Sequence, residues 1–164
     1  MIVSFAMVGL YFSLTPDKID NFSNKEIAQI DVGKFELLQF NEASMMRTLS
    51  GKSAQRFSDR IEVKKLELNE YTKKNSENLN AEHATYKEKR LHLHGGVNYK
   101  KSDNFTFITN RLFYDKELDF IYVPNDFTMN DGTNIAHARN MVYDRKNGTM
   151  TATKINALFD TKGI

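Results

Sequence analysis

Apolar side chains recur at every second position along most of this chain, and that period constrains the fold more than any other feature. Leu91 and Leu93, for example, flank the polar His92. A period of two is typical of β-strands that bury one face, whereas the buried face of a helix repeats every 3.6 residues or so. The same alternation is found in Ile61 and Val63, Leu66 and Leu68, Phe105 and Phe107, Leu118, Phe120 and Tyr122, and Phe127 and Met129. The sequence therefore predicts an all-β fold.

Short segments of turn-forming residues separate these runs. They are Asn75 with Ser76, Gly95 with Gly96, residues 102–104, residues 124–126, Asp131 with Gly132, and Asn147 with Gly148. Such residues favour tight connections, so neighbouring runs are expected to pair as antiparallel hairpins, with Gly132 supplying a positive φ. The alternation changes phase across Lys64 and Lys65, which predicts a β-bulge at that point.

A weak internal repeat has a period of about 29 residues. A small residue, four spacers and a tyrosine recur as Ala81 to Tyr86, Thr109 to Tyr114 and Ala138 to Tyr143. This period accommodates one hairpin of two strands, each about ten residues long. A single hairpin cannot bury its own apolar face, but stacked copies can. We therefore expect a twisted antiparallel sheet rolled around a shared apolar interior, as a β-jelly-roll or a trough.

The first 14 residues carry no charge, and they are followed at once by polar sequence. We expect residues 1–14 to be a membrane anchor helix, 15–34 a linker that gains order near Ile30 and Val32, and 35–164 the folded domain. A straight helix of 14 residues reaches only about 21 Å, less than a typical hydrocarbon core of about 30 Å. A cleaved signal peptide and a buried core segment are the alternatives, although the run lacks a basic start and a small-residue cleavage site.

Composition argues against several classes of function. The 23 basic and 21 acidic residues are dispersed, so no surface for nucleic acid is indicated. The chain has no cysteine, which removes disulfides and thiolate chemistry. No hydrolase or phosphate-loop motif is present, and four histidines do not supply a full ligand set, so we expect no enzyme activity, no cofactor and no metal.

One set of motifs resembles a known family. It comprises Ala81-Glu82-x-Ala84-x-Tyr86, Leu91-His92-Leu93-His94-Gly95-Gly96-Val97-x-Tyr99, Thr109-x5-Asp115, Tyr143-Asp144 and, upstream, Ser53-Ala54 with residues 61–68. In their order and spacing these are similar to the periplasmic domain of the LptC family and its OstA-like relatives. The resemblance runs from about residue 35 to residue 155, and residues 1–14 lie where that family has its single transmembrane helix.

The resemblance implies a carrier of lipopolysaccharide in the periplasm, anchored in the inner membrane. Such a carrier accepts the lipid from an ABC transporter with subunits of the LptB, LptF and LptG type, and passes it to a soluble carrier of the LptA type. Two alternatives remain open. One is a soluble LptA-like bridge protein that lacks an anchor, and the other is a secreted β-sandwich that binds sugars or protein.

The resemblance and the alternation together predict the residues that line a trough for lipid A acyl chains, although a closed core would show the same alternation. The predicted lining is Ile61, Val63, Leu66, Leu68, Leu91, Leu93, Phe105, Phe107, Leu118, Phe120, Tyr122 and Phe127.

An open sheet also has two unpaired edges, to which further copies of the fold can add. We expect one edge at Phe35, Leu37 and Phe40, and the other at Thr149, Thr151, Thr153 and Ile155. By resemblance, the first edge faces the transporter and the second faces the soluble carrier.

Overall fold

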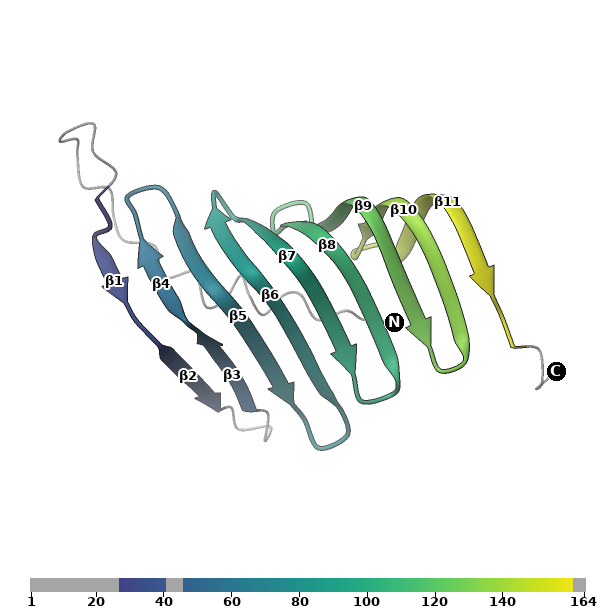
Figure 1. Cartoon of the computed structure of the whole chain (residues 1–164), viewed down its shortest axis with the longest axis horizontal. Coiled ribbons are helices and arrows are strands. Elements are labelled where there is room, and N and C mark those ends of the chain that lie inside the picture. The colour runs from purple at the N-terminus through teal and green to yellow at the C-terminus, as the bar shows by residue number, and fades with distance from the viewer. Residues whose placement is uncertain (1–26, 41–45, 161–164) are drawn as a thin grey trace.

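The computed structural model describes residues 27–40 and 46–160, which form one antiparallel β-sheet (Figure 1). Its strands are β1 (Ile30–Val32), β2 (Phe35–Phe40), β3 (Met46–Gly51), β4 (Ser53–Arg56), β5 (Ile61–Tyr71), β6 (Ser76–Lys87), β7 (Arg90–Lys101), β8 (Phe105–Asp115), β9 (Phe120–Asp131), β10 (Asn134–Asp144) and β11 (Thr149–Leu158). The prediction of an all-β antiparallel domain is confirmed.

From β5 to β11 each strand pairs with the next strand in the sequence, which makes a simple meander. On the other side of β5, β4 pairs with its first half and β3 with its second half. β1 pairs with β4, and β2 pairs with β3. The sheet therefore has an N-terminal edge made of β1 and β2 end to end, and a C-terminal edge made of β11.

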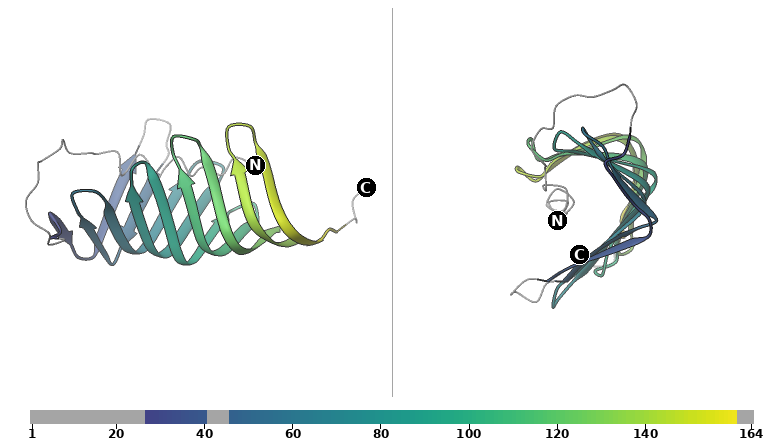
Figure 2. Two further views of the ribbon diagram at one scale, coloured as in Figure 1. Left: turned by 90° about the horizontal axis from the view of Figure 1, so that it is seen from above. Right: turned by 90° about the vertical axis from the view of Figure 1, so that its left-hand side faces the viewer.

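The sheet is strongly curved, so that it forms a trough. Seen along its long axis, the strands trace an arc that is open on one side (Figure 2). β1 and β2 lie at one end of the long axis and β11 lies at the other (Figure 1). Among the described residues, the outer strand at each end has unpaired backbone groups, so a strand of another protein can pair with either end and lengthen the trough.

A bend crosses the middle of the long strands and gives the trough its curvature. The register between neighbouring strands shifts near His94 to Val97, near Thr109 to Phe113, and near Arg139 to Met141. Several residues along this line have a positive φ, namely Lys65, Gly95, Gly96, Asn140 and Lys154. Bulges of this kind bend a strand and increase its local twist. The change of phase at Lys64 and Lys65 is confirmed, because Val63 and Leu66 are both buried and Lys65 has a φ of 52°. The bulge predicted there was wrong, since β5 and β6 keep one register across this point.

Two of the predicted turns belong to this bend and not to hairpins. Gly95 and Gly96 lie inside β7, and residues 124–126 lie inside β9. Here the prediction was wrong, because glycine and proline mark a mid-strand bend as readily as a chain reversal. The hairpin between β6 and β7 was missed. It is formed by Glu88 and Lys89, whose φ values of 49° and 61° suit a tight two-residue turn.

The repeat corresponds to one hairpin per unit, as predicted. Its small residues and tyrosines fall on β6, β8 and β10, and all six side chains are buried: Ala81, Tyr86, Thr109, Tyr114, Ala138 and Tyr143. Gly132 lies in the turn between β9 and β10 with a φ of 60°.

The N-terminal predictions fall largely outside the described residues. The anchor expected at residues 1–14 lies beyond them, and the sheet begins at Ile30, inside the stretch expected to be a linker. Across residues 27–40 and 46–160, no helix has the length and apolar character that crossing a membrane requires.

Candidate functional site

The inner face of the sheet carries a continuous apolar cluster that extends from β3 to β10. We use "inner face" for the side that carries the buried side chains, and "outer face" for the side that carries the residues alternating with them. Leu66, Leu91, Leu93, Leu112, Ile121, Val97 and Val123 are its largest fully buried members. The cluster has no break along the sheet, so the inner face is one continuous apolar layer.

Most of the predicted lining belongs to this cluster. Val63, Leu66, Leu68, Leu91, Leu93, Phe105, Phe107 and Phe127 are all buried in it, and Ile61 packs against its margin. The rings of Phe107 and Phe127 stack with their centroids 5.3 Å apart. The structure thus places these nine side chains on one face, while their contact with lipid stays a prediction.

Leu118, Phe120 and Tyr122 do not belong to this face, and the prediction for β9 has the wrong phase. Leu118 is 61% exposed in the turn before β9, and Tyr122 is 44% exposed on the outer face. Ile121 and Val123 are the buried residues instead. Apolar residues occupy both faces of β9 here, so alternation alone does not determine its phase. The correct phase could have been found from Phe127, because Ile121 and Val123 are separated from it by even numbers of residues and so share its face.

Other inner residues were missed because the bend changes the phase within a strand. In β6 the buried positions are Leu79 and Ala81 before the bend, and Ala84 and Tyr86 after it. Leu112 and Met141 likewise lie beyond the bend in β8 and β10. A single alternation extended along a whole strand cannot find these positions.

Buried polar groups lie near the strand ends of the trough. The Tyr99 hydroxyl donates a hydrogen bond of 2.7 Å to Glu77, and burial raises the pKa of both groups. At the opposite ends of the strands, Arg145 and the Tyr114 hydroxyl both donate to Asp119. These contacts fix hydroxyl and carboxylate groups where the apolar surface meets solvent.

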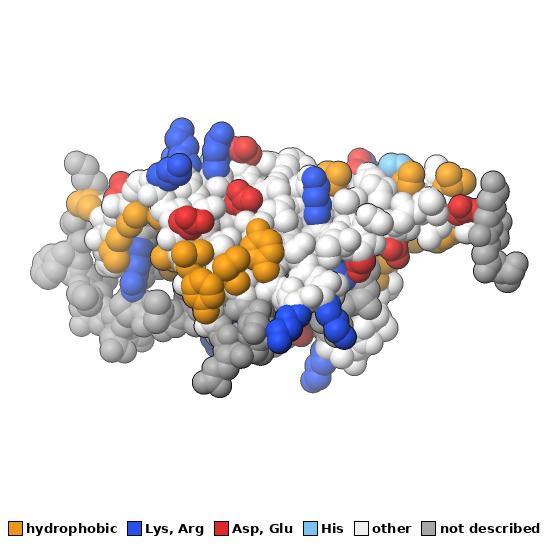
Figure 3. Space-filling view, turned by 90° about the horizontal axis from the view of Figure 1, so that it is seen from below, with side chains coloured by type: hydrophobic (Ala, Val, Ile, Leu, Met, Phe, Trp, Pro, Cys, Tyr) orange, Lys and Arg blue, Asp and Glu red, His pale blue; other side chains and the backbone are white. Residues whose placement is uncertain are grey.

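The N-terminal edge presents apolar side chains. Phe35 packs onto Gly51, where an added Cβ would lie 2.8 Å from the Phe35 ring. Leu37 and Phe40 are 48% and 68% exposed on β2, which pairs only with β3 among the described strands. In a view from below, hydrophobic side chains gather toward this end of the molecule (Figure 3).

The C-terminal edge is more polar. Thr149, Thr151 and Thr153 are exposed on β11, and Ile155 is 65% exposed. Within the described residues β11 pairs only with β10, so one side of its backbone is unpaired. Both predicted edge sets therefore lie on outermost strands, and their partners stay predictions.

A row of aromatic rings crosses the outer face. His83 stacks on His94 with a centroid separation of 4.7 Å, and His92 stacks on Phe113 at 4.2 Å. Tyr122 continues the row beyond Phe113. Burial within this row lowers the pKa of His92 and His94, which favours their neutral form.

A family described as "Lipopolysaccharide-assembly, LptC-related" matches residues 1–154. The chain belongs to this family. The prediction of an LptC-type protein that acts in lipopolysaccharide transport is thus confirmed.

A solved structure shows the same fold. It is the crystal structure of LptH, the LptA homologous periplasmic component of the lipopolysaccharide transport device from Pseudomonas aeruginosa. The match has a TM-score of 0.54 and 11% sequence identity, and it covers 70% of this chain and 94% of LptH. A search of curated protein sequences found no match.

Proposed function

We propose that this member of the family carries lipopolysaccharide by holding its acyl chains against the inner face of the trough, without any catalytic step. The observation that supports this most is the unbroken apolar cluster on one side of an open sheet. A fatty chain can enter such a trough from the open side while its charged headgroup stays in water. The residues expected to touch the acyl chains are the nine predicted lining residues that are on the inner face, together with Ile121 and Val123.

Simple energetics favour a passive carrier. Burial contributes roughly 0.8 kcal/mol per methylene, so a chain of about a dozen carbons gains on the order of 10 kcal/mol at most. A bilayer offers the same gain, and transfer between the two is therefore nearly balanced. The direction of transport must then come from a coupled energy source, for which we propose an ABC transporter of the LptB, LptF and LptG type.

The two edges are the proposed points of contact with neighbouring proteins. Edge strands can pair with a strand of another protein, which would extend the trough without a break. The N-terminal edge, with Phe35, Leu37 and Phe40, is proposed to meet the transporter. The C-terminal edge, with Thr149, Thr151, Thr153 and Ile155, is proposed to meet a soluble carrier of the LptA type.

We further propose that residues 1–14 anchor the chain in the inner membrane with the sheet in the periplasm. The alternative is a soluble bridge protein that has lost this segment. Fractionation of cells, with mass spectrometry of the N-terminus, separates the two: the anchored form remains with the membrane and retains residues 1–14, whereas the soluble form does neither.

Site-specific photocrosslinking in cells tests lipid contact. A photoreactive residue at Leu91 or Phe107 on the inner face is expected to capture lipopolysaccharide. Ile108, the exposed neighbour of Phe107, and Tyr122 are matched outer-face controls and are expected to capture none. Equal capture on the two faces, or capture only on the outer face, would overturn the proposal.

A further inference from the structure

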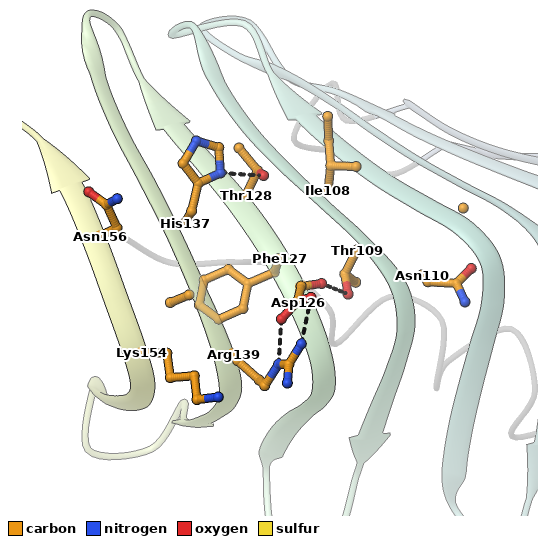
Figure 4. A pocket seen from close by; sticks show the side chains of 12 residues that line it. Ile108, Thr109, Asn110, Asp126, Phe127, Thr128, His137, Arg139, Lys154 and Asn156 are labelled. Atoms are coloured by element: carbon orange, nitrogen blue, oxygen red, sulfur yellow. Dashed lines mark hydrogen bonds and ion pairs between the residues drawn. The ribbon is translucent and has the colours of Figure 1, made fainter.

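A shallow hollow near the C-terminal edge is lined mainly by outer-face side chains. Its volume is about 620 Å³, and it extends from Gly96 of β7 across β8, β9 and β10 to β11 (Figure 4). Its polar side chains include Asp126 and Thr128, which flank the buried Phe127. Most of its lining side chains are on the outer face, and the inner-face residues Thr109, Phe127 and Ala138 also contribute to its wall.

Positive charge predominates at one end of the hollow. Arg139 donates two hydrogen bonds to the Asp126 carboxylate, and Lys154 lies beside Arg139 at the same end (Figure 4). Both cations act on Asp126, and the Arg139 hydrogen bonds hold the pKa of its carboxyl below the usual value. Asp126 is therefore ionised at neutral pH and balances one of the two cations. A net charge of about +1 remains for these three groups.

The rest of the hollow offers hydrogen-bonding groups around an apolar patch. Asn110 and Asn156 are exposed in its wall, and each amide can both donate and accept. Thr128 and His137 are joined by a hydrogen bond of 2.9 Å at the end away from Arg139 (Figure 4). Ile108 adds a side chain that is 44% exposed.

We propose that this hollow binds an anionic saccharide. The negative group would lie against Lys154 and Arg139, the amides would bind sugar hydroxyls, and Ile108 would contact the apolar C–H face of a ring. The volume falls within the range of about 300–1,000 Å³ found for small-molecule sites, and it is much larger than a bare inorganic anion requires. The anion can be a phosphate or a carboxylate, because Arg and Lys bind either.

The side chains proposed to bind the sugar are on the outer face, and none of them belongs to the set proposed to touch acyl chains. Its test is a titration of the full chain in a neutral detergent, followed by NMR chemical shifts. The probes are glucosamine 6-phosphate and N-acetylmuramic acid, with uncharged N-acetylglucosamine and inorganic phosphate as comparisons. At least one charged sugar is expected to saturate and to bind about tenfold tighter than either comparison. Which of the two binds distinguishes a phosphorylated source from a carboxylated one.

Two variants localise the site. Lys154→Gln removes the charge and keeps the side-chain length, and it is expected to weaken binding of the charged sugar by about fivefold or more. Lys100→Gln removes an exposed charge elsewhere on the outer face and is expected to change nothing. The proposal is overturned if no probe saturates, if phosphate alone binds as tightly as the charged sugars, or if the two variants weaken binding equally.

Discussion

The two faces of this sheet are built from the same strands, yet they differ in almost every physical respect. The inner face is a continuous apolar surface in which Leu93 and Val97 are fully buried. On the outer face, amides, charged groups and a row of aromatic rings alternate with exposed threonines. The difference shows that one face is shaped to exclude water and the other to meet it. The proposed lipid and saccharide sites follow that division.

The largest effect is expected from matched substitutions of two neighbours on opposite faces. Leu93→Asn places an unpaired amide in the apolar cluster and leaves a cavity, so it should lower the free energy of unfolding by about 4 kcal/mol. His92→Asn, one residue away on the outer face, should cost about 1 kcal/mol or less. Urea denaturation measures both. Similar losses for the two variants would contradict the division between the faces.

The bend that separates the two phases of β7 gives the next largest effect. At Gly95 an added Cβ would lie 2.7 Å from the Cβ of Glu82, in addition to the cost of a φ of +82°. Gly95→Ala should therefore cost about 3 kcal/mol. Gly96→Ala is the control, because it has a φ of +79° but nothing within 4 Å, and it should cost about 1 kcal/mol. Thermal denaturation of both variants measures the two losses. A larger loss of stability for Gly96→Ala than for Gly95→Ala would contradict the tight approach between Gly95 and Glu82.

A smaller effect is expected from removing hydroxyls on the two faces. Tyr99→Phe takes a hydrogen bond from the partly buried Glu77 carboxylate, and about 1–2 kcal/mol of stability should be lost. Tyr122→Phe leaves the outer-face ring in place and should change stability by about 0.5 kcal/mol or less. Chemical denaturation at neutral pH compares them. An equal response would mean that the Glu77 contact does not contribute to folding.

The smallest predicted effect is a pH dependence that comes from two histidines on the outer face. The folded state lowers the pKa of His92 and His94, mainly by burial, so the unfolded chain binds more protons as the pH falls through the ordinary histidine value of 6.5. Stability from these groups is present above that value and is lost as the pH falls below it. The double variant His92→Gln with His94→Gln should flatten the decrease in melting temperature between about pH 7 and pH 5.5. An unchanged slope would show that other groups cause it.

The inner-face residues and the turns could be predicted from sequence only where the local pattern is compatible with a single structure. Alternation identified nine of the inner residues, and the repeat with its tyrosines identified the hairpin unit, because a single phase of period two has one interpretation. Leu118, Phe120 and Tyr122 were misplaced where apolar residues occupied both faces of β9. Gly95 and residues 124–126 were taken for chain reversals, since a bend and a turn require the same backbone freedom.

The outer-face hollow could not be predicted at all. Asp126, Arg139 and Lys154 are distant in the sequence and meet only through the register of β9, β10 and β11. Nothing local in the sequence distinguishes Lys154 from other exposed lysines. The edges, by contrast, followed from order in the chain, because β2 and β11, the first and last predicted strands, lie at opposite ends of the sheet. β1 shares the N-terminal edge and was missed, since it lies in the stretch expected to be a linker.

The most direct test of the central claim is an NMR measurement of which methyl groups touch a bound acyl chain. The full chain would be loaded with lipopolysaccharide in deuterated detergent, and contacts from the acyl methylenes to methyl groups would be recorded. Methyls of Leu91, Leu93, Val97 and Val123 on the inner face are predicted to show contacts, while those of Ile108 and Val142 on the outer face show none. Contacts confined to the outer methyls, or shared equally by the two faces, would contradict the account of an apolar trough that carries lipid.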